Sequence, residues 1–328
     1  MKPRMGAVTI YSVAERAGVS ISTVSLVMNA PHRVSPATRE RVVAAAAELG
    51  YRRRADHRSE PGQLRVAVAA PFSSYPSYYR RLTGMLARAR DTTIDLMVHD
   101  LDSAAAADSP LLDALPARPG VDGVIVMGVP LSPAAVRASR AAGLPVVLVD
   151  VRSARPRGGD LPGVLVDDLL GGRLLGEHLR ERGHDRVLFV HEPQLSRDYV
   201  SAGMLRAEGV AESLALDEVA VAPDDGLERV VRAVAASGAT AVVANHDALA
   251  VRVHGVLRAS GRRIPEDVAL AGYDDGDLAA GLGLTTVRQP FEESGRAAID
   301  LLLAAIAGEG ASISRVDLAP SLVVRATT

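Results

Sequence analysis

Apolar residues near the N-terminus recur at the three- and four-residue spacing of amphipathic helices. One apolar stripe ends before Gly18, a second begins after Ser20, and together they comprise Ile10, Val13, Ala14, Ala17, Val24, Val27 and Met28. Thr9 and Ser20 stand where a hydroxyl caps the first turn of a helix. Gly18 supplies the backbone freedom that a tight turn requires. The pattern therefore predicts two short helices joined by a turn.

The outward face of the second predicted helix has an unusual composition. It carries short and mostly hydrogen-bonding side chains at Ile21, Ser22, Ser25 and Asn29, where a surface helix more often has Glu, Lys or Arg. Short side chains allow a helix backbone to approach base edges and phosphates. We therefore predict a helix-turn-helix with residues 20–29 as the recognition helix. An ordinary pair of packed helices is the alternative interpretation.

From Leu64 onward, apolar runs of strand length alternate with amphipathic helical stretches. The predicted strands are Val66–Ala70, Ile94–Val98, Val124–Met127, Val146–Val149, Val164–Val166, Val187–Val190, Ala241–Ala244 and Val268–Ala271. Continuous apolar strands between helices are typical of parallel sheets covered on both faces. The predicted fold class is a small all-α helix-turn-helix head plus an α/β body of two doubly wound parallel-sheet lobes. Lobe one is expected at about 64–155 plus a C-terminal crossover, and lobe two at about 160–285.

The charge distribution separates the head from the body. Residues 1–60 contain ten Lys or Arg and five acids, so that the net charge of −2 divides into about +5 and −7. A basic head favours phosphate binding, although a chance run of arginines would give the same excess. The chain has no cysteine, no apolar run of membrane-spanning length and no signal-peptide core. We expect a cytoplasmic, nucleoid-associated protein.

Enzyme motifs are missing from the sequence. Lys2 is the single lysine, which excludes a phosphate-cradling G-x-x-x-x-G-K loop, and neither G-x-G-x-x-G nor G-x-S-x-G occurs. The eight histidines include no H-E-x-x-H pair, and we interpret His178 and His184 as structural. We therefore expect no enzyme activity, no metal site and no cofactor.

A resemblance to a known family begins in the head. The patterns VTIYSVAERAGVSxxTVS and RVSPATRERVVAAAAELGY resemble the DNA-binding head of LacI/GalR bacterial transcriptional regulators. In the second pattern, Ser35 caps a third helix that begins at Pro36, runs through Glu48 and ends at Gly50. The segments VDGVIVMG, AAGLPVVLVD, EHLRERGHDRVLFV, IPEDVALAGYDD and LTTVRQPFEESGRAAIDLLL extend the likeness in family order.

This resemblance implies a repressor controlled by a small molecule. Family members pair into dimers whose lobes close on an effector, and two heads read the two half-sites of a pseudo-palindromic operator. Effector and operator would then be coupled reciprocally, by about 1–3 kcal/mol. We place the head at residues 1–50, a charged linker at 51–63 and the effector-binding and dimerisation domain at 64–328. The expected DNA contacts are Thr9, Tyr11, Ser20, Ile21, Ser22, Thr23, Ser25, Leu26, Asn29, His32, Arg52, Arg53, Arg54 and Arg58.

Four positions depart from the family pattern in the DNA-reading region. Leu26 replaces an arginine that reaches guanine, Arg53 and Arg54 replace Pro-Asn, and Glu60 replaces a leucine that wedges into the minor groove. We expect an unusual operator and a linker that follows phosphates. The rival hypothesis is a small-molecule-binding protein with a degenerate head that no longer reads a specific operator.

Effector-contacting residues are expected in loops beyond the carboxyl ends of the strands. Aromatic rings at Phe72, Tyr75 and Tyr78 would stack on a sugar or base, or else brace a helix start. Matching positions add Asp150, Arg197, Asp198, His246 and Asp274, of which Asp150 and Asp274 would alternatively cap turns. Asp247 is expected to cap a helix. Because Asp198 replaces an arginine, a sugar-like effector is favoured, followed by a nucleoside or another hydroxyl-rich or cationic ligand.

The linker departure leads to a first prediction. We expect Glu60→Leu to tighten operator binding, because a carboxylate is repelled by the phosphates beside the minor groove and leucine is not. Gel-shift titrations of both proteins on the same operator measure the change. Unchanged or weaker binding by the leucine variant would show that this position does not approach the groove.

Overall fold

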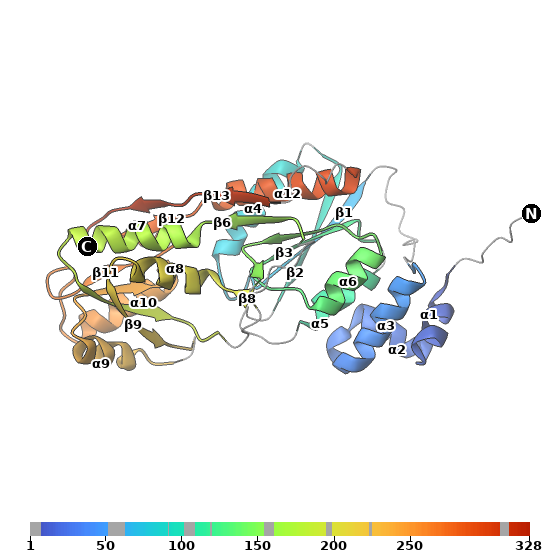
Figure 1. Cartoon of the computed structure of the whole chain (residues 1–328), viewed down its shortest axis with the longest axis horizontal. Coiled ribbons are helices and arrows are strands. Elements are labelled where there is room, and N and C mark those ends of the chain that lie inside the picture. Colours follow the sequence, from blue (N-terminus) through green and yellow to red (C-terminus); the bar gives the residue numbers. More distant parts are fainter. Residues whose placement is uncertain are drawn as a thin grey trace, which may run out of the picture. The chain divides into compact units, whose positions relative to one another are not determined.

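The computed structural model describes residues 8–51, 63–90, 92–101, 109–118, 120–153, 161–194, 199–222, 225–308 and 315–328. Two compact units are present (Figure 1). The first unit comprises Met1–Val149, Pro156–Gly163 and Gly295–Arg315, and the second comprises Asp150–Arg155, Val164–Ser294 and Val316–Thr328. We call residues 8–51 the head, the α/β part of the first unit lobe one, and the second unit lobe two.

The head consists of three α-helices and a short 3-10 helix, namely α1 (Ile10–Ala17), α2 (Ile21–Asn29), η1 (Pro31–Arg33) and α3 (Pro36–Glu48). Both predicted caps are confirmed, because Thr9 accepts a hydrogen bond from the backbone of Ser12 and Ser20 accepts one from Thr23. Gly18 ends α1 in the left-handed conformation, with φ of 65°, as the turn requires. The two predicted helices and their turn are therefore present.

The third helix has the predicted bounds but a different cap. Ser35 occupies the N-cap position before Pro36, yet its hydroxyl donates to the Thr38 hydroxyl at 3.0 Å and bonds no backbone amide. Proline at the first helical position has no amide hydrogen, so one of the usual unsatisfied donors is removed covalently. Val13, Val24 and Val42, one from each helix, are fully buried and form the centre of the head.

Lobe one is built around a parallel sheet. The six-stranded sheet to which it contributes has the order β13-β6-β4-β3-β1-β2, and the β1–β2, β1–β3 and β3–β4 pairs are parallel. The strands of this sheet are β1 (Leu64–Ala70), β2 (Ile94–Asp100), β3 (Gly123–Met127), β4 (Val146–Val149), β6 (Gly163–Val166) and β13 (Arg315–Leu318). The helices of lobe one are α4 (Ser77–Ala89), α5 (Pro110–Ala114), η2 (Leu115–Ala117), α6 (Pro133–Ala141) and α12 (Phe291–Ala307). The first residues of α12 belong to the second unit.

Lobe two repeats the parallel architecture with a four-stranded sheet of order β11-β10-β7-β9. The sheet comprises β7 (Arg186–His191), β9 (Ala215–Ala220), β10 (Ala241–Ala244) and β11 (Ala269–Ala271). Helices α7 (Asp168–Glu181), α8 (Ala202–Ala211), α9 (Glu228–Ser237), α10 (Asp247–Ala259) and α11 (Asp277–Leu282) pack around it. Short strands β5 (Arg152–Ser153), β8 (Tyr199–Val200), β12 (Thr286–Arg288) and β14 (Ser321–Val323) form two antiparallel pairs.

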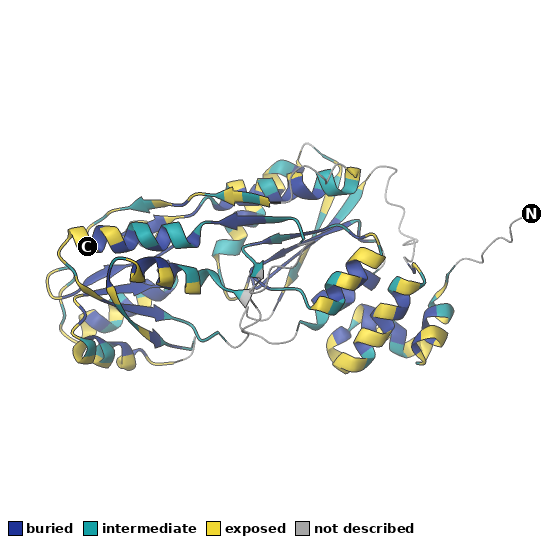
Figure 2. Cartoon of the chain, viewed as in Figure 1, coloured by how far each residue is buried: buried dark blue, intermediate teal, exposed yellow. Residues whose placement is uncertain are grey.

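The eight predicted strands all lie within observed strands, except that Val268 immediately precedes β11. Strand β9 was not predicted, because its sequence ALDEVA lacks a continuous apolar run. It lies at the edge of its sheet, where one side of the strand is open to polar side chains. Figure 2 shows buried residues along the strands and exposed residues on the outer faces of the helices. The predicted fold class is confirmed.

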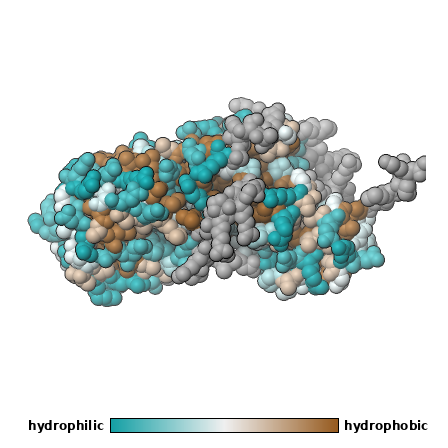
Figure 3. Space-filling view, viewed as in Figure 1, coloured by the Kyte–Doolittle hydropathy of each residue, from teal (hydrophilic) through white to brown (hydrophobic). Residues whose placement is uncertain are grey.

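Polar side chains cover much of the visible surface (Figure 3). Within the residues that the structure describes, no helix is both long and apolar enough to cross a bilayer.

Glycines allow α7 and α8 to pack at backbone distance. A Cβ atom on Gly209 would lie 2.2 Å from the carbonyl oxygen of Leu169, and one on Gly172 would lie 2.3 Å from that of Arg206. Neither neighbouring atom can turn away, because both belong to helix backbones. The close packing holds the start of α7 beside α8, which fixes the position of Arg206.

We expect Gly209→Ala to lower the free energy of unfolding by about 1–3 kcal/mol, since the new methyl group overpacks this contact. Gly255→Ala in α10 is the matched control, because an exposed Cβ there meets no atom within 4 Å. The control should be stabilised by about 0.5–1 kcal/mol through helix propensity. Urea unfolding followed by circular dichroism measures both, and equal stabilities would contradict the packing argument.

Candidate functional site

Helix α2 divides its residues between a buried face and an open face. Val24, Val27 and Met28 are buried in the head. On the other side Ile21 is 40% exposed and Leu26 is 38% exposed, and Ser22 and Asn29 are exposed as well. The recognition helix that the sequence predicts therefore presents a free surface, as contact with a DNA groove requires.

Hydrogen bonds order the polar groups on this face. Ser20 Oγ lies 2.7 Å from Ser22 Oγ and 2.9 Å from Thr23 Oγ1, and Asn29 Nδ2 donates to the Ser25 carbonyl at 3.0 Å and to Ser25 Oγ at 3.2 Å. Hydroxyl groups both donate and accept, so they can exchange these local bonds for bonds to bases or phosphates. The polar groups of this face are therefore preordered, and the face carries no charge.

Three further predicted DNA contacts flank the recognition helix. Tyr11 on α1 is 67% exposed, and Thr9 caps that helix at the same end. His32 lies exposed in η1, directly after α2. The predicted linker contacts Arg52, Arg53, Arg54 and Arg58, and the departure at Glu60, lie outside the described residues.

In lobe one, the aromatic residues surround the start of α4. Phe72 is buried and packs against Tyr78 and Tyr79, with ring centroids 6.4 Å and 5.3 Å away. Tyr75 is half-buried and meets the Tyr78 ring edge to face. The hydroxyl of Tyr78 fills the space that a Cβ on Gly128 would need. Phe72 thus packs against the start of α4, as the alternative role for the aromatic residues requires, whereas part of the Tyr75 side chain stays accessible.

In lobe two, an arginine that the sequence analysis did not single out organises the carboxyl ends of the strands. Arg206 of α8 is buried, and its Nε donates to Asp168 at 2.8 Å. Its Nη1 donates to the Asn245 carbonyl at 2.6 Å, and its guanidinium lies 3.8 Å from the centre of the Tyr273 ring. Burial alone would lower the pKa of Arg206, but the charge of Asp168 outweighs it and raises the pKa. Arg206 is therefore permanently cationic.

This arginine left one signal in the sequence. It is the single cation of α8, in the stretch AGMLRAEGVA, where Glu208 is the only other charged residue. The predicted effector contacts Arg197 and Asp198 lie outside the described residues. The observed network thus starts from a position nine residues beyond the predicted arginine.

His246 and Glu192 form a second polar pair at the same edge of the sheet. Glu192 follows β7, and its Oε1 lies 2.5 Å from His246 Nε2. The Nδ1 atom of His246 accepts a hydrogen bond from the Leu249 amide at 3.2 Å, so the ring proton resides on Nε2 and is donated to Glu192. Burial lowers the pKa of His246, but the bond to Glu192 and its charge outweigh burial and raise the pKa.

The expected cap role of Asp247 is wrong. The N-cap of α10 is His246, whose ring nitrogen takes the place of a cap oxygen. Asp247 is the first helical residue, and its carboxylate accepts bonds from Thr286 Oγ1 at 2.7 Å and Gly276 N at 2.9 Å. Burial and the nearby charge of Asp274 raise the pKa of Asp247 to about 7. Asp247 thus ties the loop after β11 to α10.

The two aspartates predicted by matching positions lie in strained turns. Asp150 has φ of 55°, and its Oδ1 accepts a hydrogen bond from the Val166 amide at 3.2 Å. This bond is of the kind expected if Asp150 caps a turn. Asp274 has φ of 120° and accepts from Gln289 Nε2 at 2.6 Å. Left-handed backbone is uncommon for residues with a Cβ and clusters at functional sites.

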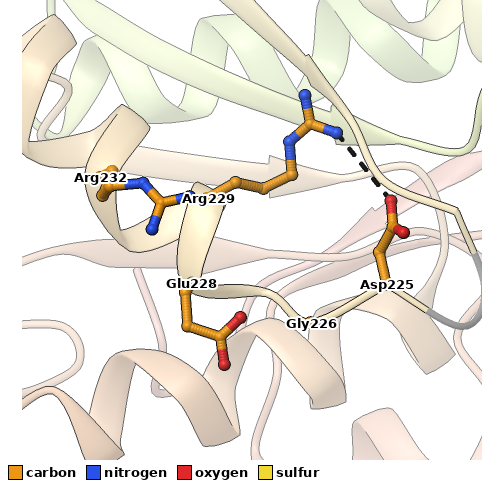
Figure 4. A pocket seen from close by; sticks show the side chains of 5 residues that line it. All are labelled: Asp225, Gly226, Glu228, Arg229 and Arg232. Atoms are coloured by element: carbon orange, nitrogen blue, oxygen red, sulfur yellow. Dashed lines mark ion pairs between the residues drawn. The ribbon is translucent and has the colours of Figure 1, made fainter.

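Figure 4 shows a surface depression elsewhere on lobe two, at the start of α9. It is lined by Asp225, Gly226, Glu228, Arg229 and Arg232, and Arg229 pairs with Asp225 at 3.9 Å. These side chains are solvated and pair with one another, so the depression offers no buried polar group to a ligand. Among the described residues, no cluster of three His, Cys, Asp or Glu is arranged to hold a metal ion.

The charge of Asp247 generates a prediction about pH. A carboxyl with an ordinary pKa of 3.8 unfolded and about 7 folded binds its proton more tightly in the folded state. That stabilisation is complete below pH 3.8 and is lost as the pH rises through 7. Between pH 5 and pH 8 we expect the free energy of unfolding to fall by about 2 kcal/mol more in the parent than in Asp247→Asn. Urea unfolding at both pH values measures this, and equal falls would contradict it.

Comparisons with known proteins agree with the geometry. Residues 9–54 match "Bacterial regulatory proteins, lacI family", and residues 177–328 match "Periplasmic binding protein-like domain". The chain is 32% identical to the HTH-type transcriptional regulator CelR of Thermobifida fusca, over 97% of each chain.

Two solved structures share the fold over nearly the whole chain. The transcriptional regulator CelR–cellobiose complex has a TM-score of 0.70 at 29% identity and covers 98% of this chain and 100% of its own. The lac repressor dimer bound to operator and the anti-inducer ONPF has a TM-score of 0.65 at 27% identity, with 98% and 99% covered. With an open recognition helix, two parallel lobes and this identity over full length, the chain belongs to the lacI family of bacterial transcriptional regulators, with a periplasmic-binding-protein-like effector domain.

Proposed function

We propose that this chain is a homodimeric repressor that binds a pseudo-palindromic operator under the control of a sugar-like effector. As a lacI-family member it is a DNA-binding transcriptional regulator and not an enzyme. The observation that carries the proposal is the exposed, short-chained polar face of α2, presented by helices whose other faces form the core of the head. Because a regulator of this family acts on DNA, we propose that the protein works in the cytoplasm, at the nucleoid.

Direct base reading would come from a few positions. Ser22 and Asn29 are exposed and hydrogen-bonding, whereas Ile21 and Leu26 offer apolar contact to thymine methyl groups. No arginine on α2 supplies the bidentate contact to guanine. We therefore propose an operator whose half-sites are recognised through thymine methyl groups and single hydrogen bonds, with phosphate contacts from the head and linker arginines.

Pairing of two chains has a candidate surface in lobe one. Helix α4 exposes Tyr79 and Leu86, and the neighbouring edge strand β2 exposes Val98. Helix α4 and strand β2 pack against each other, so the three apolar side chains belong to one region of lobe one. The lac repressor, a structural relative, is a dimer on its operator. We propose that this region contributes to a symmetric dimer contact, which would set two heads on one operator.

The chemistry of lobe two supports an effector rich in hydroxyl groups. Its polar edge carries the carboxylates of Glu192 and Asp274 and the amide of Asn245, each held by neighbouring side chains. Fixed carboxylates accept hydrogen bonds from hydroxyl groups and repel anions. The structural relative CelR binds cellobiose. We therefore propose a neutral sugar, with a nucleoside or cationic ligand as the next class.

Selection of bound fragments from random DNA, with and without candidate sugars and nucleosides, tests both parts of the proposal. We expect enrichment of one pseudo-palindrome, and a change in its yield with the correct sugar. No enriched sequence would support the rival, a binding protein with a degenerate head. Enrichment that no sugar or nucleoside alters would contradict the effector class.

A substitution ties the selected sequence to the recognition helix. We expect Ser22→Ala to change the preferred base at one position of each half-site by about 3- to 10-fold, because one hydrogen bond is lost. Ser35→Ala is the matched control, since Ser35 is an exposed hydroxyl of the head outside α2. The proposal fails if both variants select the parental sequence with unchanged preference.

A further inference from the structure

Arg39 is a buried cation in the helical head. It lies on α3, a surface helix, and is only 2% exposed. Its Nη1 donates to the carbonyl oxygens of Pro31 and Val34 at 3.4 Å each. Its Nε and Nη2 both donate to one oxygen of Asp113, at 3.2 Å and 3.1 Å. Asp113 belongs to α5 of lobe one, so the ion pair joins the head to its own lobe.

The carboxylate of Asp113 is bonded on both oxygens. Its Oδ1 accepts a hydrogen bond from Ser132 Oγ at 2.7 Å, while Oδ2 accepts both bonds from Arg39. Ser132 is also the N-cap of α6, where its hydroxyl accepts from the Ala135 amide at 3.1 Å. Asp113 is therefore also held from within lobe one, by Ser132.

A second cation, which belongs to lobe one, contacts the recognition helix. Arg118 Nε donates to the Met28 carbonyl at 3.0 Å, in the last turn of α2. Carbonyls at a helix C-terminus lack partners within the helix, and a cation there also interacts favourably with the helix dipole. Between the two polar contacts, the small residues Ala114, Ala117 and Ala138 of lobe one join the buried cluster of the head.

Docking leaves the DNA-reading face open. Tyr11, Ile21 and Leu26 are exposed while α3 and the end of α2 contact lobe one. The contact therefore presents the recognition helix and does not mask it. A head fixed in this orientation loses less rotational freedom on binding than a head tethered by its linker alone.

We propose that Arg39, Asp113 and Arg118 form a docking clamp that holds the head against lobe one with its recognition helix presented to DNA. This inference rests on the proposed function in that operator affinity is its readout. Asp113 and Arg118 are thus positioning residues for DNA binding, although they lie in the lobe. Removing Asp113 takes away the two charge-assisted bonds that this carboxylate supplies to the buried guanidinium of Arg39, which favours release of the head into water.

Operator binding by full-length variants gives the first test. We expect Asp113→Ala and Arg118→Ala to weaken binding about tenfold through lost preorganisation, and Asp113→Glu to recover part of the loss. Arg137→Ala is the matched control. Arg137 of α6 also faces the head, but it pairs with Glu40 of α3 at 3.8 Å with both side chains exposed, and such pairs contribute little. The control should stay within about twofold of the parent.

A distance measurement separates docking from general damage. Because the chain has no cysteine, spin labels can be attached to Glu15→Cys in the head and Arg140→Cys in lobe one, both exposed positions. Labelled chains diluted into excess unlabelled protein report distances within one chain. The parent and Arg137→Ala should give a narrow distance distribution, and Asp113→Ala a broad one. Circular dichroism should show the same helix content in all three.

The two experiments test the docking clamp separately from the proposed function. A broad distribution in the parent, or identical distributions in the parent and Asp113→Ala, would overturn the clamp. Weakened operator binding with an unchanged narrow distribution would also overturn it, since docking would not be the cause. Failure to select any operator would refute the proposed function, while the distance distributions would still decide whether the head is docked.

Discussion

Buried guanidinium groups set the strongest constraint on this structure. A charge taken out of water must be given a counter-charge and bonds for its remaining donors, otherwise burial costs several kcal/mol. Arg39 meets that requirement with Asp113 and two carbonyls, and Arg206 meets it with Asp168 and Asn245. Each cation therefore fixes elements that are distant in sequence. One pair joins the head to lobe one, and the other orders the polar edge of lobe two.

The head illustrates how one short helix serves both folding and function. Val24, Val27 and Met28 supply the apolar side of α2, which is too short to be stable without tertiary packing. The core and the Ser20 cap therefore fix the helix completely from one side and one end. The opposite side is then free of any folding role. Its short side chains can be selected for DNA sequence alone.

Lobe two shows how one side chain can serve two partners. His246 caps α10 through Nδ1 while its Nε2 binds Glu192. The expected capping aspartate, Asp247, is thereby released to hold the loop that carries Asp274. The polar edge is thus tied together by side chains whose charges oppose one another. Such an edge favours neutral ligands over anions.

The sequence by itself determined the helices of the head, most strands of the two parallel sheets, the fold class and the open face of α2, because these follow from local periodicity, caps and strand-length apolar runs. The edge strand β9 escaped prediction, since a strand open to solvent needs no continuous apolar run. Only the tertiary structure decided which charged residues are buried together. Arg39 and Asp113 are 74 positions apart, and Arg206 and Asp168 are 38 apart. No local pattern encodes such pairs, because their partners meet only when separate helices pack.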